Sequence, residues 1–561
     1  MITDLINELP SIRNKKELIK LKNRLTKKHH LVKVPKDIEL LCNLDKKNIE
    51  RYRKLFISKP VRTMSGVAPI AVMCKPFACP PQAKCIFCPG GPGSVYGDTP
   101  KSYPGGSPAH LRGERNYYDP YLQVFNRLEQ YSLLNQDFSK IEFIIMGGTF
   151  LTYPKIYREE FVKYAFKALN DFSEMFFDKN EFNIVKFKKF FELPADVKNA
   201  ERTKRIHEKL LKIKNKTDLR KEQIRNEKAK IRCVTFCIET RPDCSDKFQI
   251  DEILELGATR VELGIQSIYD DVLEKIERGH GNKANIEATR ILKDSFYKVG
   301  YHIMLGLPGS DRNKDINMFK ELFDNSDYKP DALKIYPCLV FKGTKLYEQY
   351  KKGEFKPITT EEAAEIIVEI KKYIPEYCRV MRIQRDIPKY LIEAGVEKAN
   401  LRQLVMDIMR KKNIKCRCIR CREPRNNEID WNSVELRRLD YEASSSKEIF
   451  ISVEDVKNDI LLGFNRLRIP YNPYRNEITD KSAGIREIHV YGRALGVGKK
   501  SDSEIQHKGI GKTMMEEAEK IAREEYDKNK MVVIAGIGVR EYFRKKFNYK
   551  QDGPYVSKRL S

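Results

Sequence analysis

Short apolar segments recur along the middle of the chain and are separated by stretches in which apolar positions follow helical spacing. Continuous apolar runs of this length are typical of strands that are buried on both faces of a parallel sheet. The expected strands are 66–73, 141–146, 232–238, 260–265, 301–307, 332–336 and 379–383. Strands that alternate with helices predict an α/β barrel, in which the chemistry lies at the carboxyl ends of the strands.

The pattern changes near the Ser-rich stretch 443–446, which we interpret as a bend or linker. Beyond it, 449–453 and 459–467 are expected to form antiparallel strands, and 485–492 a further strand. A helix with one apolar face and a strand over 531–535 follow; the apolar positions of the helix are Met514, Met515, Ala518, Ile521 and Ala522. These elements predict a second, α+β domain over residues 446–561.

Residues 1–60 are expected to form a basic helical region, with 16 Lys and Arg against 7 Asp and Glu. Leu18, Leu21 and Leu25 recur at helical spacing, so lysines occupy the remaining faces of the helix. Such a cluster suits phosphate binding, although a solvated helix surface remains the alternative for any single lysine. The lysines singled out are Lys15, Lys16, Lys20, Lys27 and Lys28.

The formal net charge of the 561-residue chain is +27, and a surface of this charge attracts polyanions. Nucleic acid is therefore the first partner to consider, and a general lysine bias of the proteome is the alternative. With 41% hydrophobic residues the chain is globular, and it has neither a signal peptide pattern nor an apolar run of the ~18 residues that span a bilayer. We expect a soluble, cytoplasmic protein.

Cys79, Cys85 and Cys88 precede a Pro-Gly-Gly sequence and are the first candidate metal site. Three close thiolates can hold a [4Fe–4S] cluster that leaves one iron without a protein ligand, where a small chelating molecule could bind. A zinc knuckle that lacks one ligand is the alternative. The repeated strand and helix units downstream make zinc less favoured here.

A second cysteine cluster, Cys416, Cys418 and Cys421, lies in the region 391–445 that we interpret as a linker. Three thiols within six residues suit one tetrahedral zinc ion better than disulfides, since disulfides are rare in a reducing compartment. Cys338 follows a predicted strand and is our candidate for the fourth ligand. The zinc would be structural.

Several polar or Gly-rich positions fall at predicted strand ends, where they would face the barrel cavity. Gly147 and Gly148 lack side chains, so the amino acid portion of a ligand can approach the backbone there. Glu239, Arg241 and Gln266 end other strands, and each could instead be a structural polar residue. Residues 177–231 are rich in Lys and Glu and are expected to form a charged helical insertion.

The sequences 72–76, 146–150 and 239–243, together with the cysteine triad, resemble those of radical S-adenosylmethionine (SAM) enzymes. More narrowly, they resemble the catalytic third subunit of Elongator, a family in which five residues lie between the first two cysteines instead of three. The resemblance implies a [4Fe–4S] cluster on Cys79, Cys85 and Cys88. It also implies SAM bound by Gly147, Gly148, Glu239, Arg241 and Gln266.

The sequence Gln506-x-x-Gly509-x-Gly511 resembles the pyrophosphate loop of the GCN5-related (GNAT) acetyltransferase fold, in which backbone N–H groups bind phosphate. A degenerate copy that does not bind CoA is the alternative. Tyr542 could contact the thioester, and Lys140 matches a family lysine that contacts acetyl-CoA from the barrel side, so these two are the predicted catalytic residues. The implied CoA-binding residues are Glu487, Ile488, His489, Val490, Gln506, Gly509, Ile510, Gly511, Lys512, Tyr542 and Phe543.

The resemblance extends over residues 60–561 and predicts a partial (βα)6 radical SAM barrel over 61–390, joined through the Cys-rich zinc linker to the acetyltransferase domain. It implies that a radical made from SAM takes a hydrogen from the methyl group of acetyl-CoA. The resulting carbon radical would add to the wobble uridine, position 34, in the anticodon stem-loop of tRNA and yield 5-carboxymethyluridine. An external electron donor is required, and a homodimer remains open.

Two other functions remain open on the sequence. In the first, the chain is a protein lysine acetyltransferase whose iron–sulfur cluster is structural. In the second, it is a tRNA-binding module with vestigial chemistry. The first predicts activity without SAM, and the second predicts tight tRNA binding without turnover of acetyl-CoA.

Overall fold

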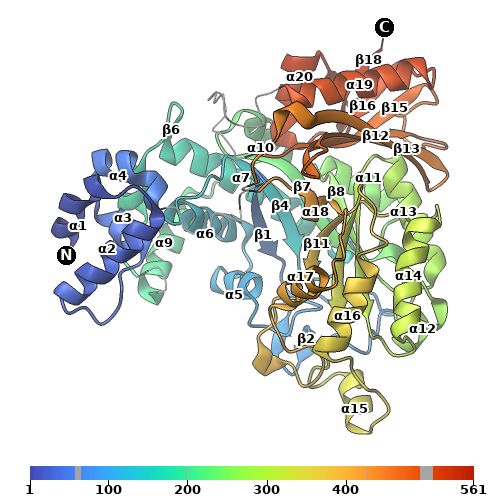
Figure 1. The fold of residues 1–561 in the computed structure, drawn as a ribbon, viewed down its shortest axis with the longest axis horizontal. Coiled ribbons are helices and arrows are strands. Elements are labelled where there is room, and N and C mark those ends of the chain that lie inside the picture. The colour runs from blue at the N-terminus through green and yellow to red at the C-terminus, as the bar shows by residue number, and fades with distance from the viewer. Residues whose placement is uncertain (57–62, 64, 197–198, 426, 493–508, 561) are drawn as a thin grey trace.

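The structure is a computed structural model that describes residues 1–56, 63, 65–196, 199–425, 427–492 and 509–560. The chain forms an N-terminal helical lobe, a large parallel sheet with helices, and a second sheet that packs on one end of the first (Figure 1). No helix of this described part is long and apolar enough to cross a membrane.

The first sheet has the strand order β1-β4-β7-β8-β9-β10-β11, and every neighbouring pair is parallel. It therefore has seven strands, one more than the predicted (βα)6 arrangement, and all seven lie at the predicted apolar segments. Their bounds are β1 (Ala68–Met73), β4 (Lys140–Met146), β7 (Arg232–Thr240), β8 (Arg260–Gln266), β9 (Lys298–Leu305), β10 (Ala332–Pro337) and β11 (Arg379–Ile383).

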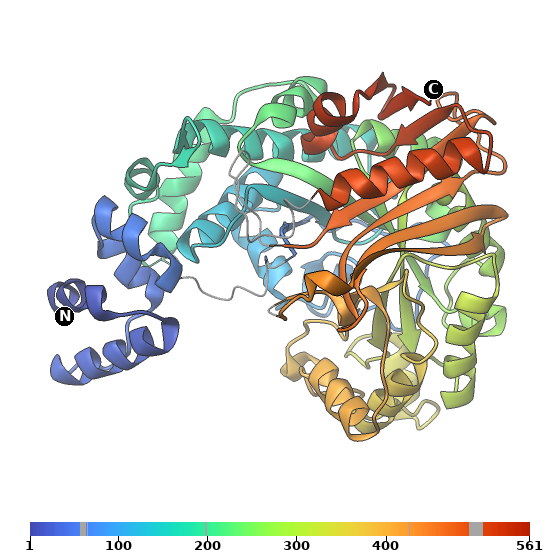
Figure 2. The same ribbon diagram turned by 45° about the horizontal axis from the view of Figure 1, so that its top comes forward.

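Helices follow the strands and cover one face of this sheet (Figures 1 and 2). A capping box begins the helix α16 (Thr360–Ile370), because Thr359 Oγ1 accepts from the Glu362 N–H and the Glu362 carboxylate accepts from the Thr359 N–H. The helix bounds are α5 (Pro108–Arg115), α6 (Pro120–Leu133), α7 (Lys155–Phe176), α11 (Lys247–Glu255), α12 (Asp270–Lys275), α13 (Asn282–Asp294), α14 (Arg312–Asp324), α15 (Lys345–Lys351), α16 (Thr360–Ile370), α17 (Leu401–Lys411) and α18 (Ile419–Arg422).

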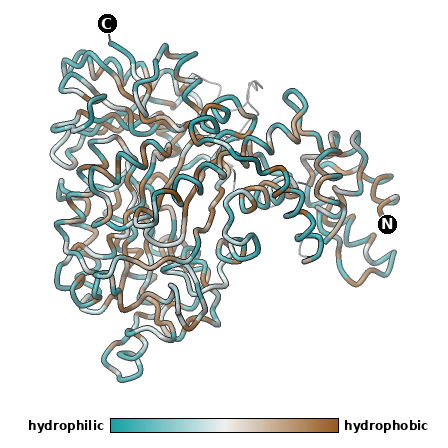
Figure 3. Tube along the Cα trace, turned by 180° about the vertical axis from the view of Figure 1, so that it is seen from behind, coloured by the Kyte–Doolittle hydropathy of each residue, from teal (hydrophilic) through white to brown (hydrophobic). Residues whose placement is uncertain are grey.

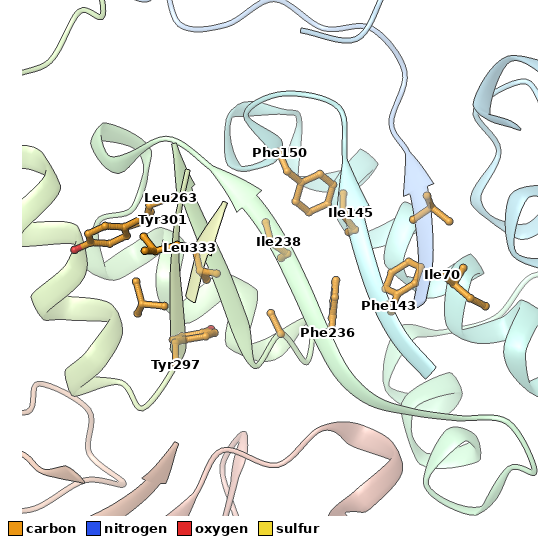
Figure 4. Packing of buried hydrophobic residues seen from close by; sticks show 14 of the residues in the cluster. Ile70, Phe143, Ile145, Phe150, Phe236, Ile238, Leu263, Tyr297, Tyr301 and Leu333 are labelled. Atoms are coloured by element: carbon orange, nitrogen blue, oxygen red, sulfur yellow. The ribbon is translucent and has the colours of Figure 1, made fainter. Parts of the chain in front are cut away.

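Side chains alternate between the two faces of the parallel sheet. Apolar residues on one face pack against the helices and form the main core (Figure 4). Five charged or titratable side chains from β4, β8, β9 and β10 contact one another on the opposite face, which we call the inner face; they are Glu142, Arg260, Glu262, His302 and Lys334. The inner face is thus polar, although the apolar runs predicted strands buried by hydrophobic contacts on both sides.

The second sheet has the order β12-β13-β14-β15-β16-β18-β17. Its first strand begins at Val434, and the predicted linker at 443–446 is the tight hairpin turn between β12 and β13, with φ of 50° and 60° at Ser444 and Ser445. Of the two alternatives, a bend is confirmed and a linker is excluded, because the turn lies inside the second sheet. The bounds are β12 (Val434–Ala443), β13 (Ser446–Asp455), β14 (Ile460–Ile469), β15 (Ser482–Val490), β16 (Lys530–Val533), β17 (Lys550–Asp552), β18 (Tyr555–Arg559), α19 (Ile510–Glu524) and α20 (Arg540–Phe547).

The N-terminal lobe is set apart from the main body (Figures 2 and 3) and has its own apolar core, which includes Leu5, Leu18, Leu25 and Phe56. Ile184 of the predicted insertion packs against this core. The lobe consists of α1 (Ile2–Glu8), α2 (Lys15–Lys28), α3 (Asp37–Asn43) and α4 (Lys46–Tyr52), and the insertion contains β5 (Phe177–Asp178), β6 (Glu181–Phe182), α8 (Ile184–Phe190), α9 (Ala200–Ile213) and α10 (Leu219–Lys228).

Candidate active site

The loop with the first three cysteines follows β1 and packs against the loop after α12. The Ile86 N–H donates to the Ile276 carbonyl at 3.1 Å. Gly279 has a φ of 79°, and a Cβ on it would lie 2.3 Å from the carbonyl oxygen of Gln82. Glycine is required here because the two backbones touch, and this contact fixes the cysteine loop at the carboxyl end of the sheet.

Two guanidinium groups approach the Cys85 thiol: Arg278 Nη1 lies 3.3 Å and Arg241 Nη1 3.9 Å from its sulfur. Burial alone would raise the pKa of this thiol, but the two positive charges hold it below its ordinary value. The pKa of Cys88 is raised by burial, while its sulfur accepts from the Ser102 N–H at 3.4 Å. Arg278 was not predicted, because only the contact through Gly279 brings it to the cysteines.

The three thiols suit a cluster better than a single ion. In the described ranges, their sulfur atoms do not form a group that lies entirely within 4.8 Å, whereas those of Cys416, Cys418 and Cys421 do. A [4Fe–4S] cube binds each cysteine to a different iron, so a wider spacing is expected. The donor set therefore fits the cluster.

The predicted Gly-rich strand end lies beside these cysteines. Gly147 and Gly148 follow β4 with φ of 127° and 111°, conformations that favour glycine. The next residue, Thr149, has its hydroxyl oxygen 3.7 Å from the Cys79 sulfur. The two motifs thus meet at one edge of the sheet, as a SAM site next to a cluster requires.

The other predicted SAM ligands take part in hydrogen bonds and ion pairs within the protein. Arg241 Nε lies 2.9 Å from Asp243 Oδ1, and its Nη2 donates to the Arg278 carbonyl at 2.7 Å. Glu239 accepts from Lys334 Nζ at 2.8 Å. Gln266 ends β8 with a φ of 67°. The side-chain contacts position Arg241 and Glu239 at the strand ends, and Gln266 is positioned by its pairing with Ile303 of β9.

An ionic network below Glu239 runs along the inner face. Lys334 contacts both Glu239 and Glu262, and Glu262 Oε2 also lies 2.9 Å from His302 Nε2. Burial opposes the charge of Lys334, yet the two carboxylates raise its pKa well above the ordinary value. The sequence signal for this network was the alternation of apolar residues with polar residues or glycine over 260–266, which places the polar side chains on one face of the strand.

The second candidate site lies where β15 and β16 separate. In the described residues the two strands pair only from Ser482↔Lys530 to Ile485↔Val533, whereas β15 continues to Val490. Residues 487–489 therefore keep β14 on one side and, within the described chain, have no β16 partner on the other. An extended ligand can form backbone hydrogen bonds along such an edge.

Gly509, which has a φ of 78°, is the N-cap residue of α19. Gln506, predicted to bind CoA, lies outside the described residues. A Cβ on Gly511 would lie 3.8 Å from the Tyr542 hydroxyl oxygen and 3.7 Å from Val490 Cγ2, so α19, α20 and the end of β15 meet here. Ile510 is buried, and Lys512 is exposed and lies 3.5 Å from Glu516.

Two predicted CoA-binding side chains face away from the opening. Phe543 is 3% exposed and belongs to the apolar core under α19, so it supports the helix instead of contacting a ligand. The Glu487 carboxylate binds Lys298 Nζ at 2.5 Å and Arg466 Nε at 2.9 Å on the barrel side. Glu487 can therefore offer a ligand its backbone only, as Ile488 and Val490 can.

Lys140 begins β4 at the amino edge of the first sheet, opposite the cysteine loop. Burial lowers its pKa. Burial also lowers the pKa of His489 to about 3, and the positive charges of Arg379, Lys298 and Lys140 lower it further. Lys140 and His489 therefore face the same region between the barrel and the second sheet.

Comparison with known proteins identifies the family. Family models described as ELP3 N-terminal domain, Radical SAM superfamily and Radical_SAM C-terminal domain match residues 1–64, 198–322 and 330–411. The chain is 46% identical over 522 residues to the tRNA uridine(34) acetyltransferase of Methanocaldococcus jannaschii, covering 91% of this chain and 88% of the relative. The chain belongs to the Elp3 family.

Two further comparisons agree. Human Elongator complex protein 3 is 37% identical over 557 residues, which cover 97% of this chain and 93% of the relative. The structure of Methanocaldococcus infernus Elp3 with residues 1–46 deleted matches with a TM-score of 0.71 and 42% identity, covering 89% of this chain and 100% of that chain. The radical SAM domain of this Elp3 family member implies a [4Fe–4S] cluster and SAM.

The second cysteine cluster of this Elp3 chain comes together as predicted. The sulfur atoms of Cys416, Cys418 and Cys421 lie within 4.8 Å of one another, and Lys371 Nζ lies 3.6 Å from the Cys421 sulfur. Three thiols at this spacing fit one zinc ion. Cys338 is not in this group: it is buried with Ile86, Leu273 and Leu346 in a separate cluster, so its selection as fourth ligand was wrong. Its place just after a strand did not indicate which loop it would meet.

The predicted tRNA-binding lysines differ in their surroundings. Lys16, Lys20 and Lys27 are exposed on α2. Lys28 Nζ lies 2.6 Å from Asp4, and Lys15 binds Asp37 at 2.5 Å and the Leu55 carbonyl at 2.9 Å. Lys15 therefore stabilises the lobe, and the exposed lysines are the better candidates for phosphate contacts.

Proposed function

We propose that this chain is a tRNA uridine(34) acetyltransferase that uses radical SAM chemistry and acetyl-CoA to form 5-carboxymethyluridine in tRNA. The observation that carries the proposal is that one strand joins the two candidate sites. β4 begins at Lys140, beside the second sheet, and Gly147 and Gly148 follow it next to the cysteine loop. Relatives with this architecture are named tRNA uridine(34) acetyltransferases.

Cys79, Cys85 and Cys88 would hold the cluster, and the glycines after β4 would admit the methionine portion of SAM. When bound, the cluster would supply one electron for the cleavage of SAM, and the resulting radical could take a hydrogen atom from a substrate. Arg278 and Arg241 stabilise negative charge on the Cys85 sulfur. The ionic network of the inner face fixes charges in place before any ligand enters, so these side chains need little reorganisation.

The opening beside β15 would hold acetyl-CoA. The backbone of residues 487–489, where β15 has separated from β16, can bind the pantetheine arm, and the N–H groups at the start of α19 can bind the pyrophosphate. The Tyr542 hydroxyl lies near Gly511, where it can donate to the thioester sulfur or to the departing thiol. Burial raises the pKa of Tyr542, which keeps this hydroxyl protonated at neutral pH.

A tRNA fits the charge of the chain, and Lys16, Lys20 and Lys27 provide exposed positive groups on the N-terminal lobe. A wobble base in a single-stranded loop can be drawn into a pocket at low cost. We assign a structural role to zinc on Cys416, Cys418 and Cys421, where it would connect the end of the barrel to the second sheet.

The test is an anaerobic reaction with reconstituted protein, tRNA, acetyl-CoA, SAM and dithionite, followed by RNA digestion and mass spectrometry. The proposal predicts 5-carboxymethyluridine that requires both SAM and reductant. Acetyl-lysine formed without SAM would instead support the lysine acetyltransferase. Tight tRNA binding without turnover of acetyl-CoA would support a binding module, and either result overturns the proposal.

A further inference from the structure

His489 and Tyr491 extend from the end of β15 toward the barrel. Ile488 precedes His489, and Val490 lies between His489 and Tyr491. The side chains of Ile488 and Val490 pack against the apolar core under α19, while Tyr491 belongs to the main core of the barrel. The His489 and Tyr491 rings are adjacent, with centroids 4.4 Å apart. Both rings therefore lie on the barrel side of the opening between β15 and β16.

Each of these rings has a buried polar atom that lacks a hydrogen-bond partner among the described residues. The two atoms are His489 Nε2 and the Tyr491 hydroxyl oxygen. Buried polar groups are nearly always paired in native proteins, because an unpaired one costs roughly 1–3 kcal/mol. Two unpaired groups on neighbouring rings at the mouth of an opening indicate a ligand atom that accepts hydrogen bonds from both.

Both groups are neutral hydrogen-bond donors at physiological pH. Burial keeps the pKa of His489 near 3, and Arg379, Lys298 and Lys140 oppose a positive charge there, against the attraction of Glu487. Burial also raises the pKa of Tyr491, although Arg379 lowers it in part. An imidazole of such low basicity is a poor general base, but a neutral imidazole can donate to a carbonyl oxygen and polarise it.

The surroundings favour an oxygen that carries partial or full negative charge. The neighbouring carboxylate, Glu487, is balanced by its own ion pairs with Lys298 and Arg466. Arg379 and Lys140 contribute further positive charge near His489, and the Phe464 ring stacks beside His489 at 5.9 Å between centroids. His489 lies in the part of β15 that has separated from β16, and Tyr491 directly follows the end of β15. Positioned donors in a buried site stabilise an oxyanion more strongly than water does, because they need no reorganisation.

We infer that His489 Nε2–H and the Tyr491 hydroxyl bind the carbonyl oxygen of the acyl thioester held beside β15. The inference rests on the proposed use of acetyl-CoA and assigns the atoms that contact the thioester carbonyl. During hydrolysis, the water oxygen adds to the carbonyl carbon and the carbon–sulfur bond breaks. One proton goes to the sulfur and one to solvent, while the pair of donors stabilises the oxyanion formed in between.

The test compares binding of acetyl-CoA with binding of S-ethyl-CoA, a thioether in which a methylene replaces the carbonyl. Calorimetry on the full chain needs no SAM and no turnover. The two additional hydrogen bonds predict that acetyl-CoA binds at least about tenfold more tightly than S-ethyl-CoA. Tyr491→Phe and His489→Phe should each reduce this preference about three- to tenfold and leave the Kd of S-ethyl-CoA unchanged. His489→Gln, which keeps an N–H donor, should restore part of it.

Infrared spectroscopy of carbonyl-labelled [¹³C]acetyl-CoA provides a second measurement. The carbonyl stretch should move to lower frequency on the parent protein and return toward its free value in Tyr491→Phe. Equal Kd values for the two ligands together with an unshifted carbonyl would overturn the inference and leave acetyl-CoA binding intact. If the parent protein binds neither ligand, the proposed function fails and the inference fails with it. Should His489→Phe not fold, the parent spectrum and Tyr491→Phe still decide.

Discussion

Arg486 of β15 forms a bidentate ion pair with Asp331, the residue before β10, at 2.8 and 2.7 Å, and both side chains are completely buried. The pair joins the second sheet to the amino end of the barrel. Arg486 also binds Glu448, and Arg468 pairs with Asp294 at 2.6 Å in the same network. The two sheets are therefore connected by fixed charges, and apolar packing alone does not hold them together.

Asp331→Asn should destabilise the whole chain, because it removes one of the two carboxylates that balance the buried charge of Arg486 and leaves Glu448 as the only remaining one of that pair. Breaking one side of a buried pair costs about 3–5 kcal/mol. Urea denaturation of the parent and the variant measures the difference in unfolding free energy. The control is Asp527→Asn, since Asp527 pairs with Lys481 on the surface and its loss should leave the unfolding free energy close to that of the parent. Equal stability of Asp331→Asn and the parent would contradict this account.

The same network predicts loss of stability in acid. Burial raises the pKa values of Asp331 and Glu487, but Arg486 lowers that of Asp331 well below its ordinary value and Lys298 and Arg466 lower that of Glu487 to about 2. Because both folded-state values lie below the unfolded ones, their contribution is complete above about pH 5 and is lost as the pH falls toward 2. Urea midpoints measured from pH 7 to pH 3 should fall less steeply in Asp331→Asn. A midpoint that stays constant down to pH 3 would contradict the prediction.

Cys85→Ser should abolish iron–sulfur cluster binding and tRNA modification and leave tRNA affinity unchanged, since the lysines proposed to bind tRNA lie on α2 and not in the cysteine loop. Iron analysis after anaerobic reconstitution and filter binding of tRNA measure the two properties. Cys233→Ser is the matched control, because Cys233 is buried in β7 and its sulfur lies 3.5 Å from the Thr235 carbonyl oxygen. Full iron content in Cys85→Ser would remove this residue from the ligand set.

Reversal of charge at Lys16, Lys20 and Lys27 should weaken tRNA binding and reduce its salt dependence. Three lost phosphate contacts lower the slope of log K against log salt by about 2–3. Lys411, Lys412 and Lys415 are also exposed, and their reversal changes the net charge equally on another helix and its following turn. Equal losses in the two triple variants would show that net charge, and not the N-terminal lobe, sets the affinity. Lys15→Glu should instead lower the melting temperature, since Lys15 binds Asp37.

Zinc should be retained in Cys338→Ser and lost in Cys418→Ser, as measured by metal analysis of the purified variants. The buried Cys378 is the better candidate for the fourth ligand. The Ile419 N–H donates to its carbonyl at 3.0 Å, and after burial the charge of Cys418 contributes most to raising its pKa. Cys378→Ser should therefore also release zinc. A protein that contains only iron, with Cys418→Ser as stable as the parent, would exclude the zinc site.

The sequence was sufficient to locate the strands of the barrel, because apolar runs at regular intervals determine where a parallel sheet can form. It was also sufficient to place Gly147 and the three cysteines at one edge, since the carboxyl ends of parallel strands coincide. These two predictions depend on local patterns and on a general rule of topology, and neither requires knowledge of side-chain contacts.

The remaining features depend on contacts between distant segments. Arg278 reaches Cys85 only through the backbone contact at Gly279, and Cys338 is separated from Cys416 by the packing of two loops. The side chain of Glu487 faces Lys298 because β15 is irregular where it pairs with β14 between Arg466 and Leu467. No periodic pattern along the chain encodes such a register shift.

The length of β4 sets the reach that the proposed chemistry demands. From Lys140 to Met146 the strand has seven residues, which span roughly 20 Å at the usual rise of an extended chain. If acetyl-CoA binds beside Lys140 as proposed, its pantetheine arm must extend along the strand so that the acetyl methyl group comes near Gly147. The acyl group of an analogue with a shortened pantetheine arm would not reach that end of the strand, even if the nucleotide part of the analogue binds tightly.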